Sequence, residues 1–402
     1  MKIIYLANLF SFSSGSEYLF WIYAKYMALK GYDITVLCYK AENDALRKVE
    51  YLLRNDMLKV YELCPNLEHR GVLFTDIISN LLYIKRGSII LEKILSKEKD
   101  VIVHSNPYMP VLLGLLVKNT SNSDFSHILS IYDVASSEGL KFIYKWFRET
   151  SNSIVAGMKS LVARAYENLI LNMTYDGIIV LSLATLNDLR KLSTVNRNNI
   201  FMVPGTIDPS LYDEKYVNNI SYEPIVLYIG RLVWYKNLET LLLAFREVSK
   251  EHKDAKLVII GDGPSRERLE RLTVRLGLRN NVNFLGKAPE STKDYWLSRA
   301  RVVVNPSIYE GFGLTILEAW LFKKPVIVSN VKPLADLVEN SKTGLLFNNH
   351  DHRNLAEKLT SLLVDEGSSE RMGMRGRQVF ETKYSPNKIA IMLEKLYHKV
   401  SA

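Results

Sequence analysis

Short apolar runs rich in β-branched residues recur along the chain, and each is followed by a stretch with helical spacing. Near-continuous apolar strands that alternate with helices are typical of a parallel sheet covered on both faces. The runs occupy residues 2–8, 33–39, 101–106, 127–133, 177–182 and 200–204, and then 225–231, 256–262, 282–286, 301–307, 325–330 and 344–347. The pattern therefore predicts an α/β fold with two Rossmann-like, doubly wound parallel sheets in tandem.

The length of 402 residues also favours two domains, because a single hydrophobic core stops growing at about 250–300 residues. A polar, turn-rich segment at 205–224 is the predicted join. We expect an amino-terminal domain at 1–206 and a carboxyl-terminal domain at 207–384, with a last helix at about 385–402 that packs back on the first domain. Ligands bind outside the carboxyl ends of the strands in open α/β sheets, so two such sheets facing each other would form a deep cleft.

Composition excludes several classes of protein. Lys plus Arg number 52 against 43 for Asp plus Glu, and no concentrated basic arm indicates a nucleic-acid partner. Cys38 and Cys64 do not have the spacing of metal ligands, and two cysteines are too few for a disulfide framework. This usage favours a reducing, cytoplasmic location. Residues 3–10 run into polar sequence without a cleavage site, so they predict a strand and not a signal peptide. The longest apolar run, 111–117, is far shorter than the roughly 20 residues of a membrane span.

The stretch YEGFGLTILEAW at 309–320 predicts a glycine-containing turn between a buried strand and a helix. Gly311 and Gly313 let the backbone approach a ligand, and the unpaired N–H groups at a helix amino terminus favour an anion such as a diphosphate. Glu310 and Glu318 flank this turn and could accept hydrogen bonds from sugar hydroxyls. The alternative is a solvated loop residue and a surface helix residue, although an unpaired Glu318 in so apolar a run would be costly.

A second stretch, 229–245, places cations at the end of another predicted strand. Gly230 and Arg231 end the strand, and Lys236 precedes a helix that Asn237 opens. Both cations would project from the carboxyl edge of the second sheet, where arginine grips phosphate in a bidentate manner and lysine adds a point charge. The alternative interpretation is two exposed surface cations.

Residues 225–347 closely resemble the carboxyl-terminal domain of family 4 glycosyltransferases, which are retaining enzymes of the GT-B fold. The matching motifs are G-R-x4-K, a G-x-G-P strand end and E-x7-E, represented by Gly230, Arg231 and Lys236, by Gly261 to Pro264, and by Glu310 with Glu318. The resemblance implies a hexosyltransferase that moves a sugar from a UDP- or GDP-linked donor to an acceptor hydroxyl. The implied acceptor is a glycan, either lipid-linked or at the cell surface.

The resemblance also assigns roles to residues. Arg231 and Lys236 would neutralise the donor diphosphate, Glu310 would bind a hydroxyl of the donor sugar, and these three form the implied catalytic group. Glu318 would hold the nucleotide ribose. The implied donor-binding residues are Gly15, Gly230, Gly311, Phe312, Gly313, Leu314, Thr315 and Glu318.

The amino-terminal half resembles the family more weakly. The sequence SSGSEYLF at 13–20 looks like the family's G-G-x-E loop, with Gly15 and Glu17 retained and Ser14 in place of the first glycine. A short turn between a strand and a helix can present N–H groups to a phosphate or to the acceptor. The alternative interpretation is an ordinary loop and helix start.

Two further strand ends resemble the acceptor side of the family. VHSNP matches its H-x-H pattern with Asn106 in place of the second histidine, and IYDVAS places Tyr132 and Asp133 where His-Asp is common. The acceptor-side candidates are therefore His104, Asn106, Tyr132 and Asp133. His104 has the alternative interpretation of a hydrogen-bonded core histidine.

The predicted chemistry needs neither cofactor nor metal. No protein nucleophile and no acidic metal-binding motif stand out, so we expect a same-face substitution in which the leaving phosphate takes the acceptor proton, with activity retained in chelator. Two alternatives share the nucleotide-sugar site: a hydrolysing epimerase of the GT-B fold, and a non-catalytic nucleotide-sugar-binding partner subunit. The absence of G-x-G-x-x-G after the first strand disfavours a dehydrogenase.

Residues 140–170 begin with aromatic and basic side chains and then place apolar residues at 154, 158, 161, 165 and 169. That spacing defines one face of a helix. The functional interpretation is peripheral contact with the inner face of the cell membrane, next to a lipid-linked acceptor. The alternative, which is the ordinary arrangement for such a helix, is that this face packs on the first sheet.

Overall fold

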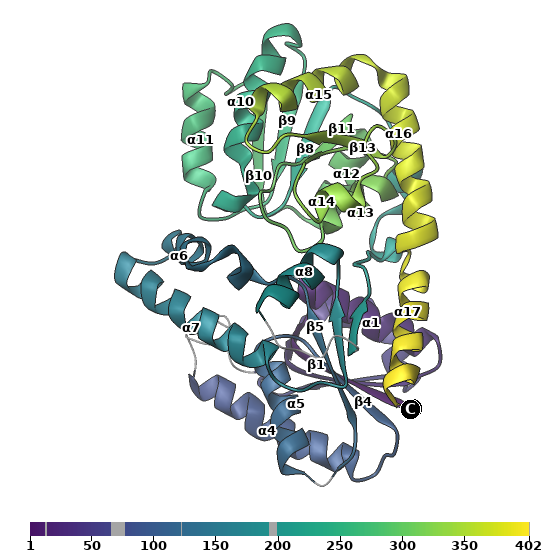
Figure 1. Ribbon diagram of the computed structural model, residues 1–402. Helices are drawn as coiled ribbons and strands as arrows, with labels where there is room; N and C mark the ends of the chain where they lie inside the picture. The colour runs from purple at the N-terminus through teal and green to yellow at the C-terminus, as the bar shows by residue number, and fades with distance from the viewer. Residues whose placement is uncertain (13, 66–76, 122, 193–198, 402) are drawn as a thin grey trace. The chain divides into compact units, whose positions relative to one another are not determined.

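The structure is a computed structural model that describes residues 1–12, 14–65, 77–121, 123–192 and 199–401 (Figure 1). Its contacts divide the chain into two compact units. The amino-terminal unit contains Met1–Ile143, Met158–Thr206 and Pro386–Ala402, and the carboxyl-terminal unit contains Tyr144–Gly157 and Ile207–Ser385. Residues 144–157 thus belong by their contacts to the carboxyl-terminal unit, although they lie in the first half of the sequence.

The amino-terminal unit is built on a parallel sheet, which has seven strands within the described residues, in the order β3-β2-β1-β4-β5-β6-β7. The strands are β1 Lys2–Phe10, β2 Asp33–Ala41, β3 Leu58–Glu62, β4 Val101–Ser105, β5 Ser126–Ile131, β6 Gly177–Val180 and β7 Ile200–Met202. Six of them coincide with predicted runs, and β3 was not predicted. Because the order runs outward from β1 in both directions, the carboxyl ends of β1 and β4 meet at the topological switch point of the sheet.

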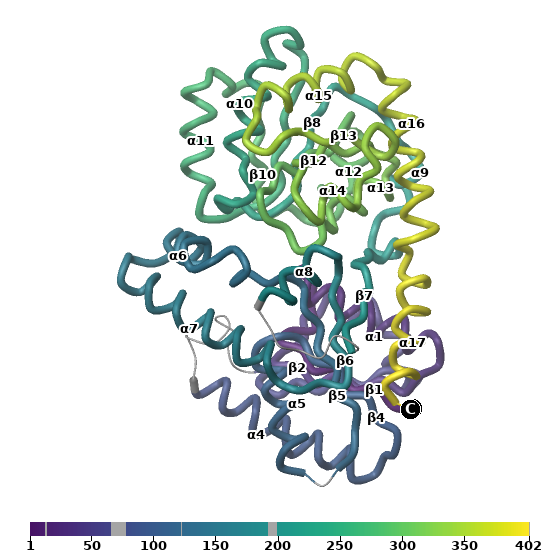
Figure 2. The backbone as a smooth tube through the Cα atoms, in the orientation of Figure 1, coloured from purple at the N-terminus to yellow at the C-terminus, as the bar shows by residue number. Residues whose placement is uncertain are grey.

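Helices cover this sheet and build its core. They are α1 Gly15–Leu29, α2 Asn43–Arg47, α3 Glu50–Arg54, α4 Ile77–Leu95, α5 Met109–Thr120, η1 Ala135–Glu138, α7 Ser153–Leu171, α8 Leu183–Leu192 and α17 Pro386–Ser401. Helix α6, Leu140–Arg148, follows η1, and its residues from Tyr144 onward belong to the carboxyl-terminal unit. One core cluster packs α4 and α5 on β1, β2 and β4, and another packs α5 and α7 on β5 and β6. Figure 2 shows α17 running alongside α1, from the opposite end of the sequence.

The carboxyl-terminal unit has a parallel sheet with six strands among the described residues, in the order β10-β9-β8-β11-β12-β13. The strands are β8 Ile225–Ile229, β9 Lys256–Ile260, β10 Val282–Gly286, β11 Val302–Asn305, β12 Val326–Ser329 and β13 Gly344–Phe347. All six coincide with predicted runs. The switch point of this sheet lies between β8 and β11, which pair through Val226 with Val302 and Leu227 with Val303.

The helices of this unit supply the other half of its core. They are η3 Pro209–Leu211, α9 Glu214–Asn218, η4 Trp234–Lys236, α10 Leu238–Glu251, α11 Arg266–Arg275, α12 Glu290–Arg299, α13 Leu314–Leu321, α14 Leu334–Leu337, α15 His352–Val364, α16 Glu366–Val379 and the π-turn η5 Phe380–Tyr384. Leu241 and Phe245 of α10 are fully buried with Leu355 and Leu359 of α15. The predicted α/β fold with two parallel-sheet, Rossmann-like units is confirmed.

The apolar face of helix α7 does not pack on the first sheet, contrary to the ordinary interpretation of this segment. It packs on the amino-terminal core through Tyr166, Ile170 and Leu171. The predicted apolar face is instead exposed, with exposed fractions of 77% at Ile154, 63% at Met158, 61% at Leu161 and 50% at Leu169. The prediction that this face packs on the sheet is therefore wrong, because the core contacts come from the neighbouring face. No helix among the described residues is long and apolar enough to cross a membrane.

Candidate functional site

The loops after β8 and β11 meet at the switch point of the carboxyl-terminal sheet. The backbone N–H of Ile308 donates to the carbonyl of Tyr235 over 2.8 Å and joins the two loops. Beside this bond, Lys236 forms an ion pair with Glu310, and both side chains are largely buried, with 15% and 14% of their surface exposed. The structure thus brings together two residues that the sequence suggested from separate motifs.

Arg231 lies on the same loop as Lys236, and its side chain is exposed but not isolated. Its Nη2 donates to the Oη of Tyr235 over 2.5 Å. Burial raises the pKa of Tyr235, and the positive charges of Arg231 and Lys236 oppose that rise only in part. Tyr235 therefore keeps its proton at neutral pH and holds the guanidinium as a neutral hydrogen-bond acceptor.

The glycines of the strand ends allow two loops to pack backbone against backbone. Gly261, which follows β9, has a φ of +137°, and a Cβ there would lie 1.9 Å from the carbonyl oxygen of Gly230. The N–H of Leu232 also donates to the carbonyl of Asp262 over 2.9 Å. Only glycine fits this approach, so the G-x-G-P motif positions the loop that carries Arg231 and Lys236.

Helix α13 begins directly after Glu310 and its glycine turn. Gly313 has a φ of +103° and occupies the amino-terminal cap position, where no side chain makes a capping hydrogen bond. Leu314 and Thr315 form the first turn and are half-buried, whereas Phe312 is buried and packs on Tyr384 with ring centroids 6.0 Å apart. The helix dipole favours an anion at this end. Phe312 could contribute to such a site only through its backbone.

Glu318 lies inside α13, and only 8% of the residue is exposed. Its Oε1 accepts hydrogen bonds from the Oη of Tyr212 over 2.8 Å and from the Nζ of Lys293 over 2.9 Å. Burial alone lowers the pKa of Lys293, but the carboxylates of Glu318 and Glu290 outweigh it and raise that pKa above its ordinary value. Glu318 is therefore a compensated buried carboxylate and not a solvated surface residue. Sequence reasoning missed Tyr212 and Lys293, because neither belongs to a motif.

Gly15 is the first residue of α1, which starts at the carboxyl end of β1. The Oγ of Ser14 accepts from the backbone N–H of Glu17 over 3.4 Å and donates to the Glu17 carboxylate over 2.8 Å. These contacts form a capping arrangement at the helix start. The geometry fits the alternative interpretation, an ordinary loop and helix start.

The acceptor-side candidates fall into two environments. His104 is completely buried, its Nδ1 lies 2.8 Å from the Oη of Tyr397 and its Nε2 lies 2.8 Å from the Oγ of Ser130. Burial lowers the pKa of His104 to about 3, so the ring is neutral. This geometry is that of a hydrogen-bonded core histidine, the alternative interpretation.

Asn106 and Tyr132 are brought together at the carboxyl edge of the same sheet. The Oη of Tyr132 donates to the Oδ1 of Asn106 over 2.5 Å, and Asn106 is 1% exposed. Asp133, the next residue, is exposed. The strand ends after β4 and β5 therefore lie side by side, as their neighbouring positions in the sheet require.

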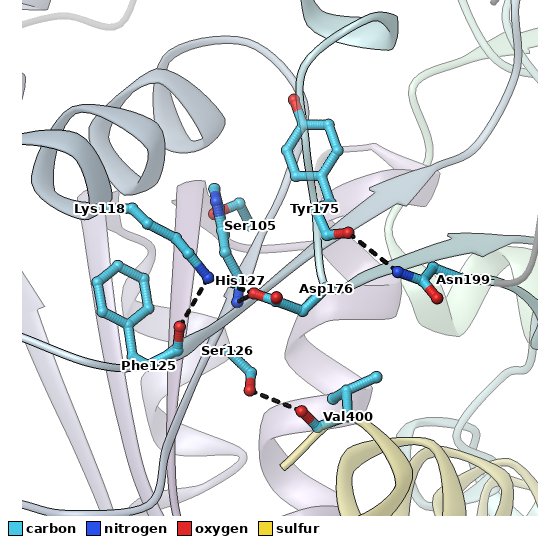
Figure 3. Close-up of polar contacts among 9 residues, drawn as sticks. All are labelled: Ser105, Lys118, Phe125, Ser126, His127, Tyr175, Asp176, Asn199 and Val400. Atoms are coloured by element: carbon cyan, nitrogen blue, oxygen red, sulfur yellow. Dashed lines mark hydrogen bonds and ion pairs between the residues drawn. The ribbon is translucent and has the colours of Figure 1, made fainter. Parts of the chain in front are cut away.

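A second buried histidine, His127, belongs to a polar network at the start of β5 (Figure 3). Its Nε2 lies 2.8 Å from the Oγ of Ser105, and its backbone N–H donates to Asp176 over 2.7 Å. Asp176 also pairs with Lys118, and the Oγ of Ser126 donates to the carbonyl of Val400 over 2.8 Å. The network ties β5 to α5, to the start of β6 and to α17, which indicates a structural role.

A cavity of roughly 340 Å³ lies in the amino-terminal unit between η1 and α7. The backbone N–H of Ser136 donates to the carboxylate of Glu167 over 3.0 Å, and burial raises the pKa of Glu167 above its ordinary value. η1 follows Tyr132 and Asp133 in the chain. The cavity is lined by Ser136, Leu161, Arg164, Ala165, Glu167, Asn168 and Leu171.

Residues 213–379 match the family model of the glycosyl transferases group 1. The chain is 32% identical over 177 residues to alpha-D-kanosaminyltransferase of Streptomyces kanamyceticus, covering 44% of this chain and 46% of that protein. It is 26% identical over 302 residues to poly(ribitol-phosphate) alpha-N-acetylglucosaminyltransferase of Staphylococcus aureus, covering 74% of this chain and 55% of that protein. The chain thus spans about half the length of these two curated relatives.

The fold extends the likeness to nearly the whole chain. The crystal structure of Anabaena HepE in complex with UDP and glucose covers 98% of this chain and 98% of its own, with a TM-score of 0.73 and 17% sequence identity. This likeness shows the GT-B fold. Together with the match over 213–379, which contains Arg231, Lys236, Glu310 and Glu318, it supports a GT-B glycosyltransferase.

Proposed function

We propose that this chain is a retaining hexosyltransferase of family 4 that moves a sugar from a nucleotide diphosphate donor to an acceptor hydroxyl. The observation that carries the proposal is the joining of Lys236 and Glu310 at the β8–β11 switch point, beside Arg231 and the amino terminus of α13. At one edge of the sheet, the anion site suits the diphosphate of the donor and the carboxylate suits its sugar hydroxyls.

In this proposal the departing diphosphate collects the negative charge of the transition state. Arg231, Lys236 and the first turn of α13 stabilise that charge. Lys236 uses one of its three N–H donors for Glu310 and keeps donors for phosphate oxygens. Glu310 orients a hydroxyl of the donor sugar, and Glu318 takes the nucleotide ribose.

In the proposed mechanism the anomeric configuration is retained because the substitution takes place on one face of the sugar. The bond from the anomeric carbon to the phosphate oxygen breaks, the bond to the acceptor oxygen forms on the same face, and the leaving phosphate accepts the acceptor proton. A double displacement would need a carboxylate nucleophile, but Glu310 is held in its ion pair with Lys236. The charge neutralisation comes from side chains, so the proposal includes no metal and no cofactor.

UDP is the first donor nucleotide to test, because the solved structure of HepE contains UDP and glucose. GDP is the second. For the acceptor we propose a glycan, since the matched relative of Staphylococcus aureus is named for transfer to poly(ribitol-phosphate). The cavity beside α7, with Ser136, Arg164 and Glu167 in its lining, is the proposed place for acceptor hydroxyls or phosphate.

We further propose a cytoplasmic location with peripheral contact to the inner face of the membrane through residues 140–170. The exposed face of α7 supports this, since Ile154, Met158, Leu161 and Leu169 would otherwise remain in water. Basic side chains at Lys159 and Arg164 on the same helix suit anionic headgroups. A lipid-linked acceptor would then meet the protein at this surface.

A panel of UDP and GDP sugars tests the proposal through protection against thermal unfolding, followed by titration calorimetry with UDP and GDP. We expect one nucleotide to bind and its sugar to be transferred to a glycan acceptor with the anomeric configuration kept. Nucleotide release without any acceptor would favour a hydrolysing epimerase. Tight nucleotide binding with no transfer to any acceptor would favour a non-catalytic partner subunit. The ordinary helix cap at Ser14 is the observation that favours this second candidate.

A further inference from the structure

Residues 145–149 contact the loops that carry the proposed diphosphate ligands. They lie at the end of α6 and just beyond it, and they belong to the carboxyl-terminal unit. The Oε1 atom of Glu149 accepts two hydrogen bonds, one from the backbone N–H of Trp234 over 2.9 Å and one from the Oγ of Ser265 over 2.7 Å. A single carboxylate oxygen therefore joins the loop after β8 to the loop after β9.

Trp234 lies in the segment that connects the two proposed phosphate-binding cations. Trp234 begins the 3-10 turn that ends at Lys236, and Arg231 lies three residues before it. Ser265 is the cap residue of α11 and is 4% exposed, so it offers a fixed anchor. Glu149 thus restrains the centre of the short segment whose two ends are the proposed phosphate-binding cations.

Two neighbours of Glu149 restrain the side chains of the same segment. The ring of Trp146 lies 5.1 Å from the ring of Tyr235, and the guanidinium carbon of Arg231 lies 5.9 Å from the Trp146 ring. The Nζ of Lys145 lies 3.8 Å above the ring of Trp234. Arg231 therefore has an aromatic ring of α6 nearby in addition to its hydrogen bond with Tyr235.

We propose that Glu149 and Trp146 are positioning residues of the donor site, which hold residues 231–236 in the conformation that binds diphosphate. The inference rests on the proposed function. An exposed arginine loses side-chain freedom when it grips a phosphate, and a charge stabiliser acts best when its position is set beforehand. The hydrogen bonds of Glu149 fix the backbone of this segment, and the Trp146 ring restricts the guanidinium.

The test compares Glu149→Ala, Trp146→Ala and the conservative Glu149→Gln. Glutamine keeps an oxygen that can accept both hydrogen bonds, so it should restore most of what alanine removes. The matched control is Glu138→Ala, which removes an exposed glutamate of η1. Calorimetry with UDP and GDP gives the dissociation constants, and thermal unfolding shows whether each variant is folded.

We expect Glu149→Ala to weaken nucleotide binding about tenfold, which is the effect of losing one or two charge-assisted hydrogen bonds. Trp146→Ala should weaken it less, Glu149→Gln should keep most of the wild-type affinity, and Glu138→Ala should bind like the wild type. Amide hydrogen exchange without nucleotide should be about tenfold faster at residues 231–236 in Glu149→Ala, because the Trp234 N–H loses its acceptor.

Two failures are distinguishable. Wild-type protein that binds neither UDP nor GDP would overturn the proposed function and this inference with it. Nucleotide binding by the wild type, with unchanged affinity and unchanged exchange at 231–236 in Glu149→Ala and Trp146→Ala, would overturn the positioning role alone. Equal loss of affinity in Glu149→Gln and Glu149→Ala, with lowered thermal stability in both, would also contradict it, because general destabilisation would then explain the loss.

Discussion

Lys236 and Glu310 are 74 residues apart in the sequence and form an ion pair between the loops after β8 and β11. This pair places the two motifs of the carboxyl-terminal unit at one point of the sheet edge. Because β8 and β11 are the strands at which the order reverses, the pair lies where doubly wound sheets bind their ligands.

Lys236→Ala should lower turnover by about 10²- to 10³-fold, because removing one oriented stabiliser of transition-state charge commonly has that effect. Initial rates with the donor found in the nucleotide-sugar panel measure it. Lys250→Ala, which removes an exposed lysine of α10, serves as the control. Near wild-type rates in Lys236→Ala would remove this lysine from the catalytic group.

Glu318→Ala should weaken donor binding and also lower the free energy of unfolding by about 1–3 kcal/mol, because Lys293 and Tyr212 lose a buried acceptor. Calorimetry and urea unfolding measure the two effects separately. Glu290→Ala is the matched control, since it removes the other, more exposed partner of Lys293. A stability loss with unchanged nucleotide affinity in Glu318→Ala would limit Glu318 to a structural role.

Turnover should persist in excess EDTA, because Arg231, Lys236 and the α13 terminus are proposed to neutralise the diphosphate in place of a metal ion. The assay is run before and after exhaustive chelation, and then with Mg²⁺ or Mn²⁺ added back. Activity that disappears in EDTA and returns with either ion would contradict the metal-independent mechanism.

Met158→Glu with Leu161→Glu should abolish binding to vesicles of phosphatidylglycerol and phosphatidylcholine. Burying an apolar side chain contributes about 1.5–3 kcal/mol, and two charges on the exposed face of α7 reverse that gain. Co-sedimentation measures the bound fraction. Val274→Glu, at an exposed apolar residue of α11, should leave it unchanged. Wild-type protein that stays in the supernatant would contradict the membrane contact.

His104 should make the protein less stable in acid. Burial lowers the pKa of His104 to about 3, below the ordinary value of 6.5, so its contribution is complete above about pH 6.5 and is lost as pH falls toward 3. By pH 4.5, two pH units below the ordinary pKa, this loss is about 3 kcal/mol. Urea unfolding at pH 7.5 and 4.5 should show a smaller difference for His104→Gln. An unchanged pH dependence, with a raised KM for the acceptor, would instead support the acceptor-side role.

Most strands could be predicted because parallel strands buried on both faces leave near-continuous apolar runs. β3 left no such run: it lies at the sheet edge, and only Leu58 of its five residues is fully buried. The strand order was not predictable, since it depends on which helices cross the sheet and not on local sequence. The exposed face of α7 shows the same limit, because an apolar helical face does not state what covers it.

The residues of the candidate site could be proposed from the sequence where a motif has a fixed spacing. Arg231, Lys236, Glu310 and Glu318 follow from glycine turns at strand ends, and the tight packing of Gly261 explains why those glycines are needed. Partners supplied by other segments carry no such signal. Lys293 on α12 and Glu149 after α6 reach the site only through the tertiary fold.

Helix α17 completes the core of the amino-terminal unit, where the hydroxyl of Tyr397 lies within hydrogen-bonding distance of both Tyr5 and His104. The ribosome therefore releases β1, β4 and their helices long before the element that fills the space between them. Until α17 has been synthesised, His104 lacks its partner Tyr397, and the amino-terminal unit cannot complete its core.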